Sequence, residues 1–516
     1  MPQWLEDAIF YEIYPQSFYD TNDDGIGDID GITAKLPYIR DMGFNAVWIN
    51  PCFDSPFLDA GYDVRDYRLV APRYGTNEDL IRCFEAAHKI GIKVILDLIP
   101  GHTSYQHEWF KKSALAEKNE YTNRYIWTNT VWDYPAGYRF VSGMTERDGN
   151  FMVNFFSSQP ALNYGFNEIK EPWQLPPTHP DCIATREAMK DVMRFWLDAG
   201  CDGFRVDMAD SLVKNDEEKK ETGKIWQNVR KMLDEDYPQA ALISEWSNPC
   251  LAIKCGFHCD FYLDHTGKGY HALMRNMDPD SKEHRSYFSK LGRGDVTAFA
   301  AEYTADYEST KNDGYISLIT GNHDTTRLSR NLDPLELKLA YAFLLTMPGV
   351  PFLYYGDEIG MKFIEGLTSK EGGYPRTGTR TPMQWNDGPN KGFSRASADR
   401  LYLPVDESSD APSVESQLAD PDSLIHEVRR LTTFRHAHKD LHDNGPFEVI
   451  YARENEYPFI YRRGNLTMAV NPSAKAAKIP VSLQGDLIYS IGEEPTRSRE
   501  SFLMEPQSFA VFQSES

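Results

Sequence analysis

Short apolar runs alternate with longer amphipathic stretches along most of the chain. The runs are rich in β-branched and aromatic residues, which is typical of buried strands. They are Ala8–Tyr14, Phe44–Ile49, Val94–Leu98, Gly203–Asp207, Ala241–Glu245, Phe257–Leu263, Gly314–Thr320 and Val350–Tyr355. Stretches with apolar residues at every third or fourth position predict helices between them, among them Asn77–Lys89, Arg186–Ala199, Thr222–Leu233 and Leu335–Thr346. This alternation predicts an α/β fold, a parallel (β/α)8 barrel of the TIM type, whose reacting groups lie at the carboxyl ends of the strands.

An open, doubly wound sheet is the alternative for such an alternating pattern. That fold carries a Gly-rich, phosphate-binding turn after its first strand. The first run of this chain is followed instead by Tyr14-Pro-Gln-Ser17, which contains no glycine. The barrel is therefore the preferred prediction.

Two regions interrupt the repeat. Residues 103–171, rich in Trp, Tyr and Asn, are too many for one connecting helix and predict an inserted subdomain on the catalytic face, after the third strand. Beyond the helical stretch Leu424–His436 the pattern changes to runs of period two, Phe447–Tyr451, Phe459–Arg462, Thr467–Val470 and Phe509–Phe512. We therefore expect a barrel from 1–102 and 172–440, a subdomain B at 103–171, and an antiparallel C-terminal β-sandwich domain at 441–516.

Composition and charge narrow the class of partner. The 516 residues suffice for one large domain with smaller ones attached. Lys and Arg number 54 against 77 Asp and Glu, a net charge of −23, which disfavours nucleic acid and anionic membrane surfaces. Seven dispersed cysteines without paired spacing predict free thiols in a reducing compartment. With no signal-like start, we expect a cytoplasmic monomer or homodimer that acts on a small molecule.

Charged residues stand at the ends of four of the predicted strands. They are Asp97 and His102, Arg205 and Asp207, Glu245, and His323 and Asp324. Each closes an apolar run, where burial normally excludes charge. A single charged residue there is explained as a cap of the next helix. Several of them at one rim of a barrel predict an active site.

The three carboxylates Asp207, Glu245 and Asp324 suit the hydrolysis of glycosides. That reaction needs one carboxylate to attack the anomeric carbon and one carboxylic acid to protonate the leaving oxygen. Arg205 precedes Asp207 by two residues, so it projects from the same side of the strand. We expect its charge to keep Asp207 ionised.

These motifs, in this order, resemble the four short motifs of the α-amylase family of glycoside hydrolases. The resemblance extends to the opening Ile9–Pro15 and to Gly349–Glu358. It implies that Asp207 is the nucleophile, Glu245 the general acid/base and Asp324 the stabiliser of the transition state. It further implies a glucosyl subsite completed by three side chains, those of His102, Arg205 and His323. The implied outcome is retention of the α configuration through a covalent glucosyl-enzyme.

Two further segments resemble the oligo-1,6-glucosidases and related α-glucosidases of this family. They are Asp59–Asp63 and Arg376–Trp385. By this resemblance Tyr62 stacks on the terminal ring, while Asp59 binds its far hydroxyls and pairs with Arg376. Such a pair closes the pocket beyond the non-reducing end, which implies exo action. The alternative is that Arg376 and Arg380 anchor a long loop and that Asp63 caps a segment.

Two positions depart from the family pattern. In this branch the residue after the nucleophile is Val in enzymes that prefer α-1,6 linkages and Ala or Thr in those that prefer α-1,4, whereas here it is Met208. The preferred linkage therefore stays open. Gly101 replaces the usual Asn before His102, which puts in doubt the amylase-type calcium between barrel and subdomain.

An acidic loop near the N-terminus predicts a different cation site. Oxygen-bearing side chains recur at alternate positions from Asp20 to Asp28, with glycines between them, as in loops that bind hard cations. The loop resembles a structural calcium site of the same α-glucosidases, which implies as ligands Asp20, Asn22, Asp24, the Ile26 carbonyl and Asp28. We expect Ca²⁺ there, with Mg²⁺ as another occupant; an acidic turn without an ion is the alternative.

The function expected is that of a retaining, exo-acting α-glucosidase that releases glucose from short α-glucosides. The nearest alternative hands the glucosyl group to another sugar, as sucrose- or trehalose-type isomerases do. An endo-amylase is disfavoured by the expected Asp59–Arg376 pair. A non-catalytic relative, such as an amino-acid-transporter subunit, is disfavoured because the motif positions are intact and no anchor segment is found.

Overall fold

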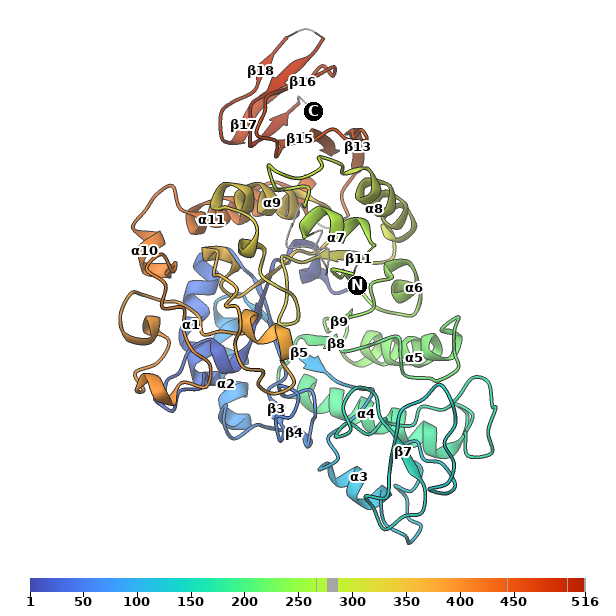
Figure 1. The fold of residues 1–516 in the computed structure, drawn as a ribbon. Coiled ribbons are helices and arrows are strands. Elements are labelled where there is room, and N and C mark those ends of the chain that lie inside the picture. The colour runs from blue at the N-terminus through green and yellow to red at the C-terminus, as the bar shows by residue number, and fades with distance from the viewer. Residues whose placement is uncertain (266, 276–285, 443, 499, 515–516) are drawn as a thin grey trace.

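The computed structural model describes residues 1–265, 267–275, 286–442, 444–498 and 500–514. Its centre is an eight-stranded parallel sheet in the order β11-β10-β9-β8-β5-β2-β1-β12 (Figure 1). These strands are β1 (Phe10–Ile13), β2 (Ala46–Ile49), β5 (Lys93–Leu98), β8 (Gly203–Val206), β9 (Ala241–Ser244), β10 (Cys259–Tyr262), β11 (Tyr315–Leu318) and β12 (Phe352–Tyr354). A parallel bridge between Ile319 and Phe352 joins the two edges. The predicted barrel is thus confirmed, with every strand inside a predicted run except β5, which begins one residue earlier, at Lys93.

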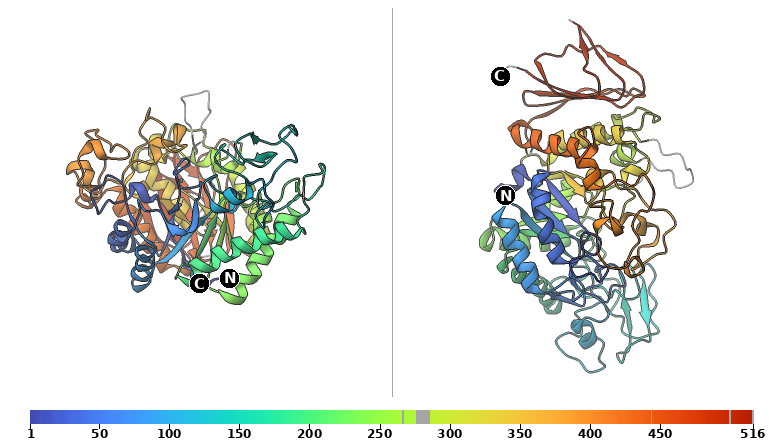
Figure 2. Two further views of the ribbon diagram at one scale, coloured as in Figure 1. Left: turned by 90° about the horizontal axis from the view of Figure 1, so that it is seen from below. Right: turned by 90° about the vertical axis from the view of Figure 1, so that its left-hand side faces the viewer.

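Helices surround the barrel (Figures 1 and 2). They are α1 (Ile29–Asp41), α2 (Asn77–Lys89), α4 (Pro180–Asp198), α5 (Lys220–Asp236), α6 (Pro249–Lys254), α7 (Gly269–Met274), α8 (Thr297–Thr310), α9 (Pro334–Thr346), α10 (Val414–Leu418) and α11 (Leu424–Ala437). Helix α2 begins at a capping box, in which Thr76 and Asp79 bond each other's backbone N–H. Its buried side chains include Leu80 and Phe84, one turn apart, so a single face packs inward.

Short 3-10 helices complete the connections. They are η1 (Gln3–Asp7), η2 (Pro15–Ser17), η3 (Leu328–Arg330), η4 (Asp357–Ile359), η5 (Tyr374–Thr379), η6 (Pro389–Gly392), η7 (Ala398–Arg400) and η8 (Lys439–Leu441). None of the helices in the described ranges combines the length and the apolar character needed to cross a bilayer. All seven cysteines are free thiols.

The insert after β5 consists largely of loops and lies at one end of the molecule. It contains α3 (Glu108–Ser113) and the hairpin of β6 (Phe140–Ser142) and β7 (Asn150–Met152), while the loop after β2 holds β3 (Phe53–Asp54) and β4 (Asp66–Val70). Phe110 contacts both Trp127 and Phe151, with ring centroids 5.8 and 4.9 Å away, so these aromatics form a small core. An antiparallel bridge between His102 and Ala161 ties the insert to the rim of the barrel.

The C-terminal strands form two antiparallel sheets at the opposite end from the insert (Figure 2). They are β13 (Phe447–Tyr451), β14 (Phe459–Arg463), β15 (Leu466–Asn471), β16 (Ala477–Ile479), β17 (Asp486–Ile491), β18 (Thr496–Arg497), β19 (Phe502–Met504) and β20 (Ser508–Gln513). The larger sheet packs on α9, where Phe343 lies 6.1 and 6.0 Å from the rings of Phe459 and Tyr461. Helix α9 is therefore buried between barrel and sheet.

Candidate active site

The predicted catalytic side chains meet at the carboxyl-end rim of the barrel. Asp207 follows β8 directly and Glu245 follows β9 directly, while Asp324 lies in the loop after β11. Arg205 projects from β8 itself and is 1% exposed. Parallel strands end at the same edge of a sheet, which is why motifs far apart in the sequence converge here.

Arg205 is the centre of the charge network. Its Nη1 lies 2.8 Å from Asp97 Oδ1 and 3.2 Å from Asp207 Oδ1. Its Nη2 lies 2.6 Å from Glu245 Oε1. One buried guanidinium therefore faces three carboxyl groups, so the cluster holds more negative than positive charge and favours retention of a proton.

The pKa of Asp207 reflects this surplus of negative charge. Burial raises the pKa of Asp207 well above its usual range, and the hydrogen-bonded Glu245 carboxyl raises it further against the opposing charge of Arg205. Arg205 lowers the pKa of Asp207, as expected, but burial and Glu245 outweigh its charge. Asp207 and Glu245 lie against the same guanidinium, which places two carboxyl groups together as glycoside chemistry requires.

The turn after Asp207 also holds Glu245. Met208 has a φ of 43°, in the left-handed region that residues with a side chain rarely adopt. In this conformation its backbone N–H donates to Glu245 Oε2 at 3.1 Å. This conformation costs roughly 1–2 kcal/mol, and it points the backbone N–H of Met208 at the proposed acid Glu245.

Asp260 on β10 fixes the loop that follows Glu245. Its Oδ1 accepts from the Ser244 hydroxyl at 2.6 Å and from the Trp246 N–H at 3.1 Å. Its Oδ2 accepts from the Asn248 N–H at 2.7 Å. Burial nevertheless raises the pKa of Asp260 to about 7.

Two arginines hold Asp324. Arg376 Nη1 lies 2.7 Å and Arg380 Nη2 lies 2.8 Å from the same oxygen, Asp324 Oδ1. Burial would raise the pKa of Asp324, but its four basic neighbours outweigh burial and lower it well below its usual range; they are His323, Arg380, Arg376 and Arg205. Asp324 is therefore ionised across the physiological pH range and offers a fixed negative charge.

Asp59 and Arg376 meet less closely than the resemblance implies. Arg376 Nη2 lies 4.0 Å from Asp59 Oδ1, and the shortest ion pair of Arg376 is with Asp324. Asp59 Oδ2 instead accepts from Gln159 Nε2 at 2.7 Å, and burial raises the pKa of Asp59 to about 6. Asp63 accepts from the Asp59 N–H at 3.0 Å, so it shapes this loop from within.

A chain of hydrogen bonds connects His323 with the floor of the site. Tyr62 Oη lies 2.7 Å from His323 Nε2 and donates to Asp97 Oδ2 at 3.1 Å. On the other side, His323 Nδ1 lies 3.0 Å from Glu12 Oε1 and 3.2 Å from Asn50 Nδ2. Burial lowers the pKa of His323 to about 3, so the imidazole is neutral at pH 7.

Several contacts of this site were not predicted from the sequence. Arg380 was assigned only to a loop, and the roles of Glu12, Asn50, Gln159 and Asn154 were not identified. Glu12 did leave a signal, because it interrupts the apolar run Phe10–Ile13. It is fully buried, and its Oε2 has no hydrogen-bond partner among the described residues.

The predicted cation loop is compact and lies apart from these residues. Asp20 is 4% and Asp28 is 5% exposed. Asp20 Oδ2 accepts from the Gly25 N–H at 2.8 Å and from Ser394 Oγ at 2.5 Å, and Asp24 Oδ1 accepts from the Ile26 N–H at 2.8 Å. Within the described part of the chain, no three His, Cys, Asp or Glu side chains form a group that could hold a metal. Each carboxylate oxygen of Asp20 and Asp28 already accepts two hydrogen bonds, so a bound cation has to displace some of these donors. The types of oxygen donor in the loop are nevertheless those that hard cations take.

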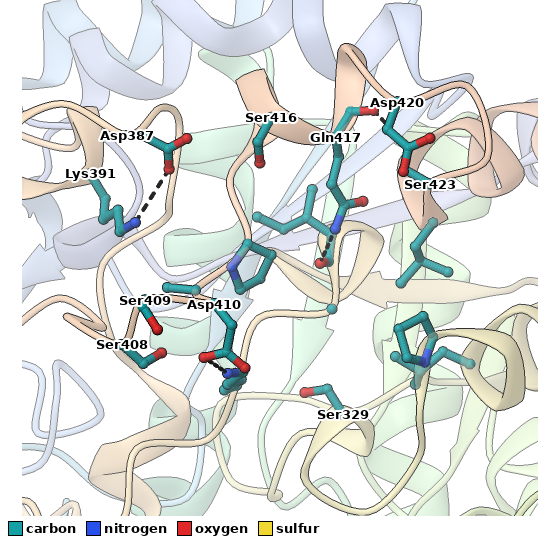
Figure 3. Close-up of a pocket in the computed structure, with 18 of the residues that line it drawn as sticks. Ser329, Asp387, Lys391, Ser408, Ser409, Asp410, Ser416, Gln417, Asp420 and Ser423 are labelled. Carbon is teal, nitrogen blue, oxygen red and sulfur yellow. Dashed lines mark hydrogen bonds and ion pairs between the residues drawn. The ribbon is translucent and has the colours of Figure 1, made fainter.

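A separate cavity of about 910 Å³ lies beside α10 and the loop that precedes it (Figure 3). Two ion pairs line it, Lys391 with Asp387 at 3.3 Å and Lys362 with Asp410 at 2.6 Å. None of the candidate catalytic residues is among the residues that line it. The proposed chemistry therefore does not use this cavity.

Fold, motif order and rim geometry together define a class of glycosidase. The model of the α-amylase catalytic domain matches residues 12–444, and the chain belongs to the α-amylase family of glycoside hydrolases. It is therefore a glycosidase-type enzyme whose substrate class is carbohydrate.

Curated relatives of the chain carry several activities of that family in their names. The chain is 33% identical to the trehalose synthase/amylase TreS of Mycolicibacterium smegmatis over 87% of this chain and 80% of that protein. It is 30% identical to an oligo-1,6-glucosidase of Parageobacillus thermoglucosidasius, over 89% and 87%. The α-glucosidase of Apis mellifera is 32% identical, over 83% and 78%.

Solved structures agree with the fold. An α-glucosyl transfer enzyme, XgtA, superposes with a TM-score of 0.81 at 26% identity, with both chains covered completely. An isomaltulose synthase of Erwinia rhapontici NX5 gives a TM-score of 0.82 at 22% identity, over 99% of both chains.

Proposed function

We propose that the protein is a retaining, exo-acting α-glucosidase that releases terminal glucose from short α-linked oligosaccharides. The observation that supports this proposal best is the placement of Asp207 and Glu245 against the two terminal nitrogens of one buried guanidinium, that of Arg205. It provides a nucleophile and an acid in one pair, without a cofactor in the reacting step.

The first half of the reaction forms a glucosyl-enzyme. Asp207 attacks the anomeric carbon as the bond from that carbon to the leaving oxygen breaks, and Glu245 gives its proton to that oxygen. Asp324, held ionised by its arginines, faces the sugar hydroxyls and the positive charge that develops on the ring.

The second half returns the enzyme to its starting state. Glu245, now a carboxylate, takes a proton from water as the water oxygen attacks the anomeric carbon and Asp207 leaves. Two inversions at this carbon give net retention. Arg205 pairs with both carboxyls throughout, so it limits the cost of moving the proton within a buried site.

Exo action is proposed because three side chains form a wall at the outer end of the site. Asp59, Gln159 and Arg376 come from three separate segments, and Asp59 contacts both of the others. A wall beyond the terminal ring leaves no exit for a chain that extends past its non-reducing end. Hydrolysis from that end follows from this geometry.

A second candidate function uses the same intermediate and a sugar in place of water. It is favoured by the trehalose synthase/amylase at 33% identity and by the α-glucosyl transfer enzyme among the structural neighbours. In that case the sugar acceptor, or the departing sugar itself, attacks the glucosyl-enzyme and gives a new disaccharide.

Product analysis distinguishes these functions. The protein is incubated with maltose, isomaltose, trehalose, sucrose and maltoheptaose, and the products are resolved by chromatography. Free glucose from the disaccharides supports the glucosidase, a new disaccharide of the same mass supports transfer, and mid-chain products from maltoheptaose contradict exo action. Asp207→Asn is expected to lower kcat by roughly 10⁴-fold or more. The exposed Asp313→Asn serves as the matched control, and a rate of Asp207→Asn near that of the control would contradict the assignment of the nucleophile.

The acidic loop is proposed to bind Ca²⁺, or Mg²⁺, through Asp20, Asn22, Asp24, the Ile26 carbonyl and Asp28. The ion would hold a loop that also contacts residue 394, far along the chain. It has no part in the reaction steps.

A further inference from the structure

His102 is held at the rim of the barrel by partners from two segments. It is 1% exposed, and its Nε2 lies 3.1 Å from the backbone carbonyl of Tyr62. Its Nδ1 lies 3.2 Å from Asn154 Nδ2, an amide of the inserted subdomain. Asn154 follows the hairpin strand β7, and its backbone N–H donates to the Gln159 carbonyl at 3.2 Å.

The donor and acceptor roles in this cluster have one consistent solution. A carbonyl oxygen only accepts, so the contact with Tyr62 requires a proton on Nε2 of His102. The amide nitrogen of Asn154 also lies 3.0 Å from the Gly101 carbonyl, which fixes the orientation of the amide. Its remaining N–H then donates to an unprotonated Nδ1.

Gly101 provides the space for this amide. A Cβ added at Gly101 would lie 3.0 Å from Asn154 Nδ2, tighter than most side-chain contacts, so the amide would have to move by a few tenths of an ångström. Gly101 and the amide of Asn154 are therefore structurally coupled, although 53 positions separate them in the sequence.

The residues after Asn154 reinforce the same contact. Arg139 donates to the carbonyls of both Asn154 and Phe155. The Phe155 ring stands edge-on to His102, 5.9 Å between centroids. Gln159, four residues further on, donates to Asp59. The segment 154–159 of the insert thus contacts both His102 and Asp59.

We propose that Asn154 is a positioning residue, which holds His102 as the neutral Nε2–H tautomer and so couples the inserted subdomain to the glucosyl site. In this tautomer the Tyr62 carbonyl and the Asn154 amide together fix the orientation of the ring, which is uncharged. The effect on turnover rests on the proposed glucosidase or transferase function; the tautomer itself does not.

The first test is Asn154→Asp, which keeps the shape of the side chain and replaces its donor by an acceptor. Burial lowers the pKa of His102 to about 4, and Lys214, the charged group that faces it, lowers the pKa further. A carboxylate at 154 favours a second proton on the ring and is expected to raise this pKa by roughly one to three units. The titration is followed by NMR of ¹⁵N-histidine-labelled protein. The control is Asn119→Asp, an exposed amide of the same subdomain that likewise donates to a backbone carbonyl.

The outcomes separate the inference from the proposed function. A His102 that titrates nearer neutral pH in Asn154→Asp but not in Asn119→Asp supports the inference even if every α-glucoside tested is inert. An unchanged titration in a folded Asn154→Asp variant would overturn it. Where the wild type is active, kcat/KM of Asn154→Asp is expected to fall roughly tenfold, with an added dependence on pH that Asn154→Ala does not show.

The second test uses the coupling with Gly101. Gly101→Ala is expected to displace the amide and to lower kcat/KM by a similar factor. In the Asn154→Ala background, where there is no amide to displace, Gly101→Ala is expected to add little. Additive losses would show that the two positions act independently and would contradict the inference.

Discussion

Glu358 gives the sharpest prediction about stability. It follows β12, is fully buried, and accepts from Tyr11 Oη at 2.6 Å and Tyr38 Oη at 2.8 Å. Burial raises its pKa from 4.5 to about 7, although both tyrosine hydroxyls oppose the shift. A carboxyl with a raised pKa in the folded state costs no folding free energy below pH 4.5, where both states are protonated. The cost grows as the pH rises toward 7 and is then constant.

The magnitude follows from the shift. A difference of about 2.5 pKa units at 1.36 kcal/mol each is about 3 kcal/mol above pH 7. With an unfolding entropy of roughly 2.1 cal/mol/K per residue, this corresponds to about 3 °C in Tm for a chain of 516 residues. Glu358→Gln keeps the shape without the charge. Relative to wild type, its Tm is therefore expected to rise by about 3 °C between pH 4.5 and pH 8.

Calorimetric scans of both proteins at several pH values measure this difference. Other buried carboxyls make the Tm of both proteins depend on pH in the same way, so only the difference in Tm between variant and wild type is informative. The exposed Glu117→Gln is the control and is expected to show no such trend. A difference in Tm that does not change with pH would refute the reasoning.

The remaining predictions concern pH and metal. Burial raises the pKa of Asp97 and of Asp59 to about 6 each. Because protonation of Asp97 would weaken its ion pair with Arg205, kcat/KM is expected to rise with pH through about 6. A rate that is flat from pH 5 to 7 would contradict this. Removal of a loop-bound cation by a chelator is expected to lower Tm by about 2–3 °C if the ion is present at roughly 100 times its Kd. Adding Ca²⁺ is expected to restore the Tm. An unchanged Tm in protein whose metal content has been measured would count against the site.

Apolar periodicity was enough to predict the barrel, because strands buried on both faces leave unmistakable runs. The run Gly203–Asp207 ends within one residue of β8, and its charged residues reach the rim as expected. The positions of loop residues were harder to predict, since a loop has no period. Arg376 was assigned to Asp59, yet its closest ion pair is with Asp324. The roles of Asn154 and Gln159 depend on how the insert folds back over the rim, which residue spacing does not encode.

The burial of α9 has a consequence for the limits of the catalytic unit. Its residues from Leu339 to Thr346 are all buried, so this helix has no stripe facing water, and the sheet of β14 and β15 covers the side that the barrel leaves open. A chain cut before β13 would expose that apolar side and associate through it. The terminal strands therefore form part of the outer shell of the barrel, and a minimal enzyme has to retain them.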